Sequence, residues 1–177
     1  MFFYFKMLFS KFWTNLCILL YCNNWSKIIV CDIDNTIADT WKNIENEKIP
    51  YSKLPYFDNV LKFIFSKKDN KTGIIFLSFR PQKKFIISKK WLEKIGFKIS
   101  IFQLVLCPSS KFKIYFLKKM ISLNKKILYI DDLSYNQENG KIKFYDYVLN
   151  ELKNLNIDYF GYNELKMLQN KSTQIES

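Results

Sequence analysis

The chain of 177 residues contains no histidine and only one arginine, Arg80, although it has 28 basic residues in all. Lysine therefore supplies almost all of the positive charge behind the formal net charge of +12. Such a charge can indicate a polyanionic partner such as nucleic acid. The lysines are scattered along the chain, however, and a composition rich in Lys, Ile, Asn, Phe and Tyr is typical of A/T-rich coding. The charge alone is therefore weak support for a nucleic-acid partner.

Features of secreted, metal-thiolate and multidomain proteins are also missing. The four cysteines, Cys17, Cys22, Cys31 and Cys107, lack the spacing of metal ligands or of a disulfide framework. Free cysteines fit a reducing compartment, and we therefore expect a cytoplasmic protein. The length suits one domain, and neither an internal repeat nor a linker divides it. We assign this domain to residues 26–170 and a flexible polar tail to residues 171–177.

Residues 1–25 contain an apolar stretch, residues 12–22, that follows Lys6 and Lys11. This stretch is too short to span a bilayer comfortably, and no small-residue cleavage site follows it. We expect residues 1–25 to form a helix packed on the domain. Membrane association through this segment, as a signal-peptide core or a membrane-surface helix, is the alternative.

The remaining sequence alternates between segments typical of strands and of helices. Continuous apolar runs predict strands at residues 27–33, 73–78, 101–107, 126–130 and 157–160. Helices are expected at residues 57–66, at 83–95, from Ser109 or Ser110 as N-cap to 123, at 144–155, and from 163 onward. Unbroken apolar strands between helices indicate a sheet covered on both faces. The predicted fold is α/β, a Rossmann-like three-layer sandwich around a mainly parallel five-stranded sheet.

Polar residues follow the predicted strands at the edge of the sheet where ligands bind in such folds. Asp32 and Asp34 follow the first strand, Ser78 and Arg80 the second, and Asp131 and Asp132 the fourth. Side chains at i and i+2 on a strand end point the same way, so Asp32 and Asp34 should lie close together. Two close carboxylates are costly unless a cation lies between them or one is protonated, which suits a magnesium site.

The ordered set of motifs resembles the haloacid dehalogenase-like (HAD) superfamily of phosphohydrolases. Its four motifs are an Asp-x-Asp-x-Thr loop at residues 32–36, a serine after an apolar strand, a lysine that opens a helix, and a pair of acids after another strand. They occur in that order between residues 27 and about 135. The resemblance implies a HAD-like fold and a Mg²⁺-dependent phosphatase, because the acid at Asp34 favours phosphoryl transfer over dehalogenation.

The resemblance also implies the role of each residue. Asp32 would be the nucleophile that forms an aspartyl-phosphate, and Asp34 the general acid and base. Mg²⁺ would be bound by the Asp32 carboxylate, the Asp34 backbone carbonyl and Asp131. Ser78 would bind a phosphoryl oxygen. The substrate- and phosphate-binding set would be completed by Thr36, Arg80, Lys111 and Asp132, of which Asp132 could also reach the metal.

Two of these positions have alternatives. The lysine that neutralises the phosphoryl group is either Lys113 or Lys111; Lys113 is favoured because it shares a helix stripe with Leu117 and Met120. Arg80 has two possible roles. Its planar guanidinium either recognises a phosphate or carboxylate through two parallel hydrogen bonds, the fork geometry, or forms a structural salt bridge.

Little sequence remains for a cap over the site. Only about residues 40–54 are available, and Trp41, Tyr51 and Tyr56 are candidates for the rim of an open site. Such nearly capless phosphohydrolases act on phosphorylated small molecules, nucleotides or nucleic-acid ends. Two other hypotheses remain: a non-catalytic module that binds a phosphorylated or acidic partner, and a membrane-associated phosphatase acting on a lipid or envelope phosphate.

Overall fold

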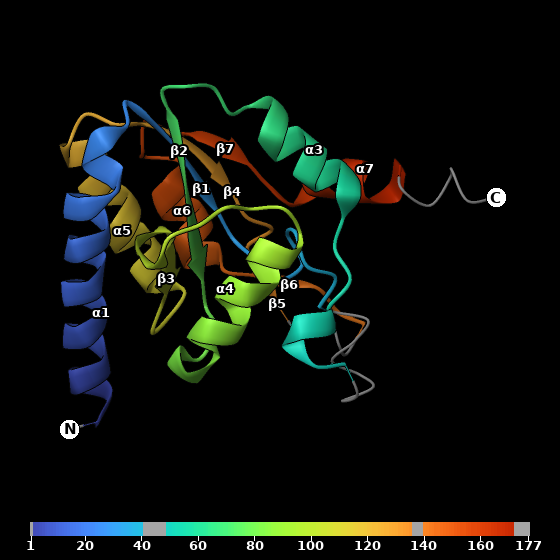
Figure 1. Cartoon of the computed structure of the whole chain (residues 1–177), viewed down its shortest axis with the longest axis horizontal. Coiled ribbons are helices and arrows are strands. Elements are labelled where there is room, and N and C mark those ends of the chain that lie inside the picture. The colour runs from blue at the N-terminus through green and yellow to red at the C-terminus, as the bar shows by residue number, and fades with distance from the viewer. Residues whose placement is uncertain (1, 41–48, 136–139, 172–177) are drawn as a thin grey trace.

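The computed structural model describes residues 2–40, 49–135 and 140–171 (Figure 1). Five parallel strands form its central sheet, in the order β3-β2-β1-β4-β7. The strands are β1 (Lys27–Cys31), β2 (Thr72–Ser78), β3 (Leu104–Leu106), β4 (Lys126–Ile130) and β7 (Asp158–Phe160). The predicted α/β class and the predicted parallel five-stranded sheet are therefore confirmed.

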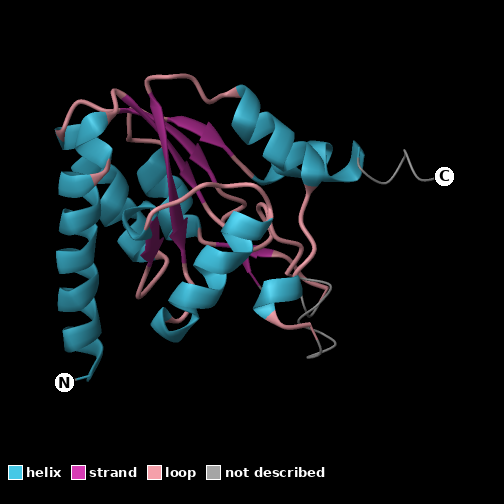
Figure 2. Cartoon of the chain, viewed as in Figure 1, coloured by secondary structure: helices cyan, strands magenta, loops and turns pink. Residues whose placement is uncertain are grey.

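Helices cover both faces of this sheet and make it the middle layer of three (Figure 2). On one face lie α3 (Asp58–Ser66), α4 (Phe85–Lys94) and α7 (Tyr162–Lys171). On the other lie α1 (Phe2–Leu20), α5 (Lys111–Ser122) and α6 (Asp146–Leu152). Because strand side chains alternate, β1 sends Ile29 and Cys31 to the first face and Ile28 and Val30 to the second. Burial on both faces explains why the strands are continuous apolar runs.

Helix α1 lies against the side of the sheet where β3 is the outermost strand (Figure 1). The indole Nε1 of Trp13 donates a hydrogen bond to the carbonyl oxygen of Leu104 at 3.0 Å. The hydroxyl of Tyr21 accepts bonds from the Ile74 backbone N–H and the Gln103 amide, both at 3.0 Å. These contacts cover a sheet edge that would otherwise expose backbone groups. Among the described residues, no helix is long and apolar enough to cross a membrane.

Several element boundaries differ from the predicted ones. Strand β1 ends at Cys31 rather than at residue 33, and residues 101–103 form a 3-10 turn, so that β3 is short. Residues 82–84 are also a 3-10 turn that precedes α4. For the two strands, the predicted range extends beyond the backbone pairing, which the sequence pattern does not reveal. Ser110 occupies the N-cap of α5, as predicted, and makes no side-chain capping bond.

The carboxyl-terminal region also differs from expectation. The helix expected over residues 144–155 is the shorter α6, because residues 143 and 144 form β6 (Lys143–Phe144). This strand pairs antiparallel with β5 (Ser134–Tyr135), a small sheet that sequence reasoning did not predict. Two-residue strands carry too little periodic pattern to be recognised.

Part of the predicted cap lies outside the described residues, including Trp41, and so does nearly all of the predicted tail. The described part of the cap segment forms a 3-10 turn, Tyr51–Lys53, that packs beside α4.

Candidate active site

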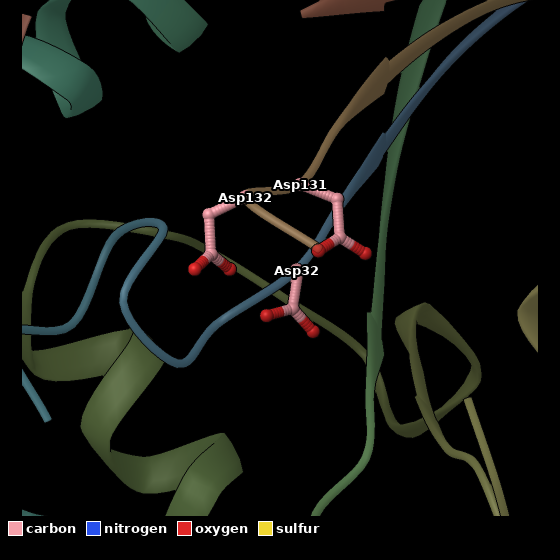
Figure 3. Close-up of side chains that lie close together, drawn as sticks. All are labelled: Asp32, Asp131 and Asp132. Atoms are coloured by element: carbon pink, nitrogen blue, oxygen red, sulfur yellow. The ribbon is translucent and has the colours of Figure 1, made fainter. Parts of the chain in front are cut away.

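Three aspartates meet at the carboxyl end of the sheet, where the neighbouring strands β1 and β4 end. Asp32 directly follows β1, and Asp131 and Asp132 directly follow β4. Figure 3 shows the three side chains close together, with their carboxylates directed to the same side. One carboxylate oxygen of each lies within 4.8 Å of the others, and all three residues are buried. The structure therefore brings together residues that are about 100 positions apart in the sequence.

Lys113, on the first turn of α5, places its ammonium between two of these carboxylates. Its Nζ lies 2.9 Å from Oδ1 of Asp32 and 2.7 Å from Oδ2 of Asp131. Only 5 % of its side chain is exposed. Lys111, the competing candidate, is exposed, and its Nζ lies over the ring of Tyr147 at 4.8 Å. Of the two lysines, Lys113 is thus the one in contact with the acids.

Asp131 is fixed from several directions. Its carboxylate accepts hydrogen bonds from the Tyr129 hydroxyl and, at 2.9 Å, from the Leu133 backbone N–H. The hydroxyl of Tyr159 donates to its backbone carbonyl, also at 2.9 Å. A carboxylate with this many fixed donors has one orientation, which is the requirement for a preorganised metal or phosphoryl site.

Asp132 is held by two hydroxyl-bearing residues. Its backbone N–H donates to Oγ1 of Thr36 at 3.2 Å, and the Ser134 hydroxyl donates to its carboxylate. Thr36, which was predicted to belong to the phosphate-binding residues, is fully buried. Its hydroxyl lies 3.5 Å from Oδ1 of Asp132. The structure thus places Thr36 as a residue that orients Asp132.

The Asp34 carboxylate is not part of this cluster and pairs with Arg80. Arg80 donates from Nε to Oδ2 at 2.8 Å and from Nη2 to Oδ1 at 2.7 Å. The Ser78 hydroxyl donates to the same Oδ2 at 3.2 Å. Asp32 and Asp34 therefore do not share a cation through their side chains, contrary to the expectation from their i, i+2 spacing. The physical reason is that β1 ends at Cys31, so strand alternation no longer applies at these two positions.

Arg80 is itself held firmly in a buried position. Its Nη1 donates to the Ser88 hydroxyl on α4 at 3.0 Å. The guanidinium carbon lies 4.8 Å from the centroid of the Tyr51 ring and 5.9 Å from that of Trp91. Arg80 is 2 % exposed. Of its two predicted roles, the salt bridge is the one that the structure shows, and Arg80 makes it to Asp34 through two parallel hydrogen bonds. Its recognition of a substrate phosphate or carboxylate stays a prediction.

The electrostatics of the cluster follow from burial and from like charges. Burial raises the pKa of Asp32 well above the usual carboxyl range; Lys113 opposes this shift, and Asp131 adds to it. Burial and the neighbouring Asp131 raise the pKa of Asp132 to about 7. Burial disfavours the Lys113 ammonium, but Asp131 and Asp32 outweigh that effect, and the pKa of Lys113 lies well above its usual value. Lys113 contacts two of the three carboxylates, and Lys166 acts on Asp132 by lowering its pKa, so three carboxylates stand against two ammonium groups when they are ionised.

A divalent metal ion fits this donor set. The donors are carboxylate oxygens, the ligands that Mg²⁺, Ca²⁺ and Mn²⁺ prefer, and a divalent cation would favour their ionised forms. The carboxylates placed to bind it are those of Asp32, Asp131 and Asp132. Asp132 therefore joins the predicted ligands Asp32 and Asp131. The predicted contact of Asp34 with the metal would be made through its backbone carbonyl, and this contact stays a prediction.

Sequence reasoning missed several residues that build this site. Tyr129 precedes Asp131 by two positions near the end of β4, so strand alternation could have placed its hydroxyl beside that carboxylate. Ser134 and Ser88 carry no such signal, because their contacts depend on a turn after β4 and on the packing of α4.

Comparison with known proteins gives similarity only at the level of solved structures. No protein-family model and no curated protein matches the sequence. Two solved structures of the class C acid phosphatase from Bacillus anthracis, one of them with tungstate bound, are similar to this chain. Their sequences are 17% and 18% identical to it, with a TM-score of 0.45 in both cases. Each alignment covers 90% of this chain and 78% of the other.

Proposed function

We propose that the protein is a Mg²⁺-dependent phosphatase that hydrolyses phosphomonoesters through an aspartyl-phosphate on Asp32. The observation that carries this proposal is the Lys113 ammonium held between Asp32 and Asp131, beside Asp132, at the carboxyl end of the sheet. A phosphoryl group next to Asp32 would meet this ammonium and the neighbouring cation site together. Positioning and charge neutralisation are the main needs of phosphoryl transfer.

In the first step, an oxygen of the Asp32 carboxylate attacks phosphorus. The bond between phosphorus and the ester oxygen breaks, and the leaving oxygen takes a proton from Asp34. In the second step, water attacks the phosphorus of the aspartyl-phosphate while Asp34 accepts the water proton. The bond from phosphorus to Asp32 then breaks, inorganic phosphate leaves, and both carboxyls regain their starting states.

The remaining residues stabilise charge and geometry. Lys113 neutralises charge on Asp32 and on the transferring phosphoryl group. Mg²⁺ bound by Asp32, Asp131 and Asp132 supplies further positive charge for the phosphoryl oxygens. Ser78 lies within hydrogen-bond distance of Asp34, and in this proposal its hydroxyl turns to a phosphoryl oxygen when substrate binds. We propose a phosphorylated small molecule, a nucleotide or a nucleic-acid end as substrate.

Hydrolysis of a phosphoester panel tests the proposal. The panel contains p-nitrophenyl phosphate, nucleotides, sugar phosphates and oligonucleotides phosphorylated at the 3′ or 5′ end. We expect turnover with Mg²⁺, loss of turnover with a chelator, and loss of turnover in Asp32→Asn. If the protein hydrolyses nothing on the panel but binds a phosphorylated partner equally well with and without Asp32→Asn, it is a binding module instead.

The exposed face of α1 favours a membrane-associated form of this activity as a second candidate. This face carries the large apolar side chains of Phe9, Phe12 and Leu19, which are 47–62 % exposed. Lys11 is exposed beside them. Apolar side chains with flanking lysines suit the surface of an anionic membrane. Flotation with anionic and with neutral vesicles tests it. Binding to anionic vesicles that Phe9→Ser/Phe12→Ser abolishes supports this candidate, and no binding contradicts it.

A further inference from the structure

A cavity of about 570 Å³ lies beside the candidate active site, where α1 faces the chain segments that follow β2 and β3. Lys6 and Ser10 of α1 line one side of it. Arg80 and Lys83 line it from the segment after β2, and Cys107 from the segment after β3. Its volume is in the range of ligand pockets and suits a group of nucleoside size.

This cavity adjoins the groups proposed to react. Arg80, which lines it, binds the Asp34 carboxylate. Cys107 donates its backbone N–H to the carbonyl oxygen of Ser78 at 2.7 Å. The thiol of Cys107 is buried, and it lies close enough to Lys113 and Asp32 for their charges to affect its pKa. A substrate with its phosphoryl group at Asp32 could therefore extend its leaving group into the cavity.

The polar groups of the cavity favour an anion. Lys6 and Lys83 are among its lining residues, and none of the lining residues is acidic. Arg80 also lines it, although its guanidinium is paired with Asp34. Ser10 is 2 % exposed, and its hydroxyl has no hydrogen-bond partner among the described residues. Lys6 and Ser10 are one helical turn apart and so share a face of α1. A buried hydroxyl without a partner, in a cavity lined by cations, is suited to bind a ligand oxygen.

We propose that this cavity binds the leaving group of the substrate and that the leaving group carries a second phosphate. Lys6 and Lys83 neutralise that phosphate, and the Ser10 hydroxyl donates to one of its oxygens. Helix α1 thus supplies the substrate contacts that a larger cap would otherwise provide. The inference rests on the proposed phosphatase activity, because it names the substrate class of the same site.

Steady-state kinetics test this preference with adenosine 3′,5′-bisphosphate and the two adenosine monophosphates. The measured quantity is kcat/KM for the bisphosphate divided by that for the better monophosphate. We expect a ratio above one for the natural sequence and a fall of about tenfold in the ratio for Lys6→Gln/Lys83→Gln. The matched control is Lys68→Gln/Lys98→Gln. It removes two exposed lysines that precede β2 and β3, at the amino ends of the strands and so on the side of the sheet opposite the candidate site. Its ratio should equal that of the natural sequence.

Ser10→Ala separates binding from packing. Because the Ser10 hydroxyl has no partner in the described structure, its removal should leave Tm unchanged or raise it while lowering the ratio. A lower Tm with an unchanged ratio would show that Ser10 is purely structural and would overturn its assigned role.

The failure of this inference differs from the failure of the proposed function. If p-nitrophenyl phosphate is hydrolysed but Lys6→Gln/Lys83→Gln keeps the ratio of the natural sequence, the cavity assignment is wrong and the phosphatase assignment stands. If nothing is hydrolysed, the phosphatase assignment fails. Calorimetric titration of the bisphosphate and monophosphates then decides the inference: tighter binding of the bisphosphate, lost in the double variant, supports the cavity site, and equal binding overturns it.

Discussion

The guanidinium of Arg80 binds both carboxylate oxygens of Asp34, at 2.8 Å and 2.7 Å. Asp34 is the proposed general acid and base, so the only arginine of the chain holds the residue that must give up and take back a proton. A carboxyl that carries a proton cannot accept a hydrogen bond fully on both oxygens. In the acid step, therefore, Asp34 has to loosen one of the two bonds to Arg80. In the proposed mechanism, the pair positions the Asp34 side chain, and its partial opening accompanies proton transfer.

Arg80→Lys tests the importance of the fork geometry. A lysine keeps the positive charge but cannot bind both oxygens of Asp34 and the Ser88 hydroxyl in one plane. We expect kcat to fall by about 10- to 100-fold, with a loss of about 1–3 kcal/mol in the free energy of unfolding. Kinetics and urea denaturation measure the two effects. Ser88→Ala serves as a control, since it removes one Arg80 contact and leaves the fork intact. An Arg80→Lys protein with full activity would show that the fork does not position the acid.

The paired variants Lys113→Met and Lys111→Met separate the two candidate lysines. Lys113→Met leaves Asp32 and Asp131 buried without their ammonium, so we expect a loss of about 3–5 kcal/mol in the free energy of unfolding and near-complete loss of activity. Lys111→Met removes an exposed side chain and should change stability by about 0.5 kcal/mol or less. Equal effects of the two substitutions on activity and stability would contradict the role given to Lys113.

The pKa of Asp132, about 7 in the folded protein, gives the stability a definite pH dependence. The ordinary value is 3.8, so the folded state binds this proton more tightly than the unfolded chain. The contribution of Asp132 to stability is therefore highest at low pH and falls as pH rises from about 4 to about 7. Without divalent cations, the natural protein should lose at least about 1 kcal/mol of stability relative to Asp132→Asn over this range. Denaturant unfolding of both proteins across pH measures the difference. If the two proteins differ by the same free energy of unfolding at every pH, Asp132 does not bind its proton more tightly in the folded state.

Magnesium should reverse this penalty. A cation bound to Asp32, Asp131 and Asp132 favours their ionised forms, and it binds the folded state alone. At about 100 times its Kd, Mg²⁺ should stabilise the protein by about 2.7 kcal/mol, with much less effect on Asp132→Asn. Thermal unfolding with Mg²⁺ and with a chelator measures this effect. Stabilisation of the same size in the variant would place the ion elsewhere.

The sequence was sufficient to predict the sheet and the place of the site but not its contacts. Strand β4 has the predicted bounds, because a short apolar run before two aspartates leaves little ambiguity. The pairing of Arg80 with Asp34 could not be predicted, since it depends on how β1 ends and on Ser88 and Tyr51 packing around the guanidinium. The role of Asp132 beside Asp131 was open for a similar reason. Its orientation is set by Thr36, 96 positions earlier in the chain.

Detection of the phosphorylated intermediate tests the central claim most directly. The protein would be mixed with Mg²⁺ and a turned-over phosphomonoester, quenched in acid within the first turnover, digested and analysed by mass spectrometry, with Asp32→Asn treated in parallel. We predict one added phosphoryl group on the peptide that contains Asp32, and none in the variant. Phosphate release without any labelled peptide, or label on another residue such as Ser78, would contradict the account.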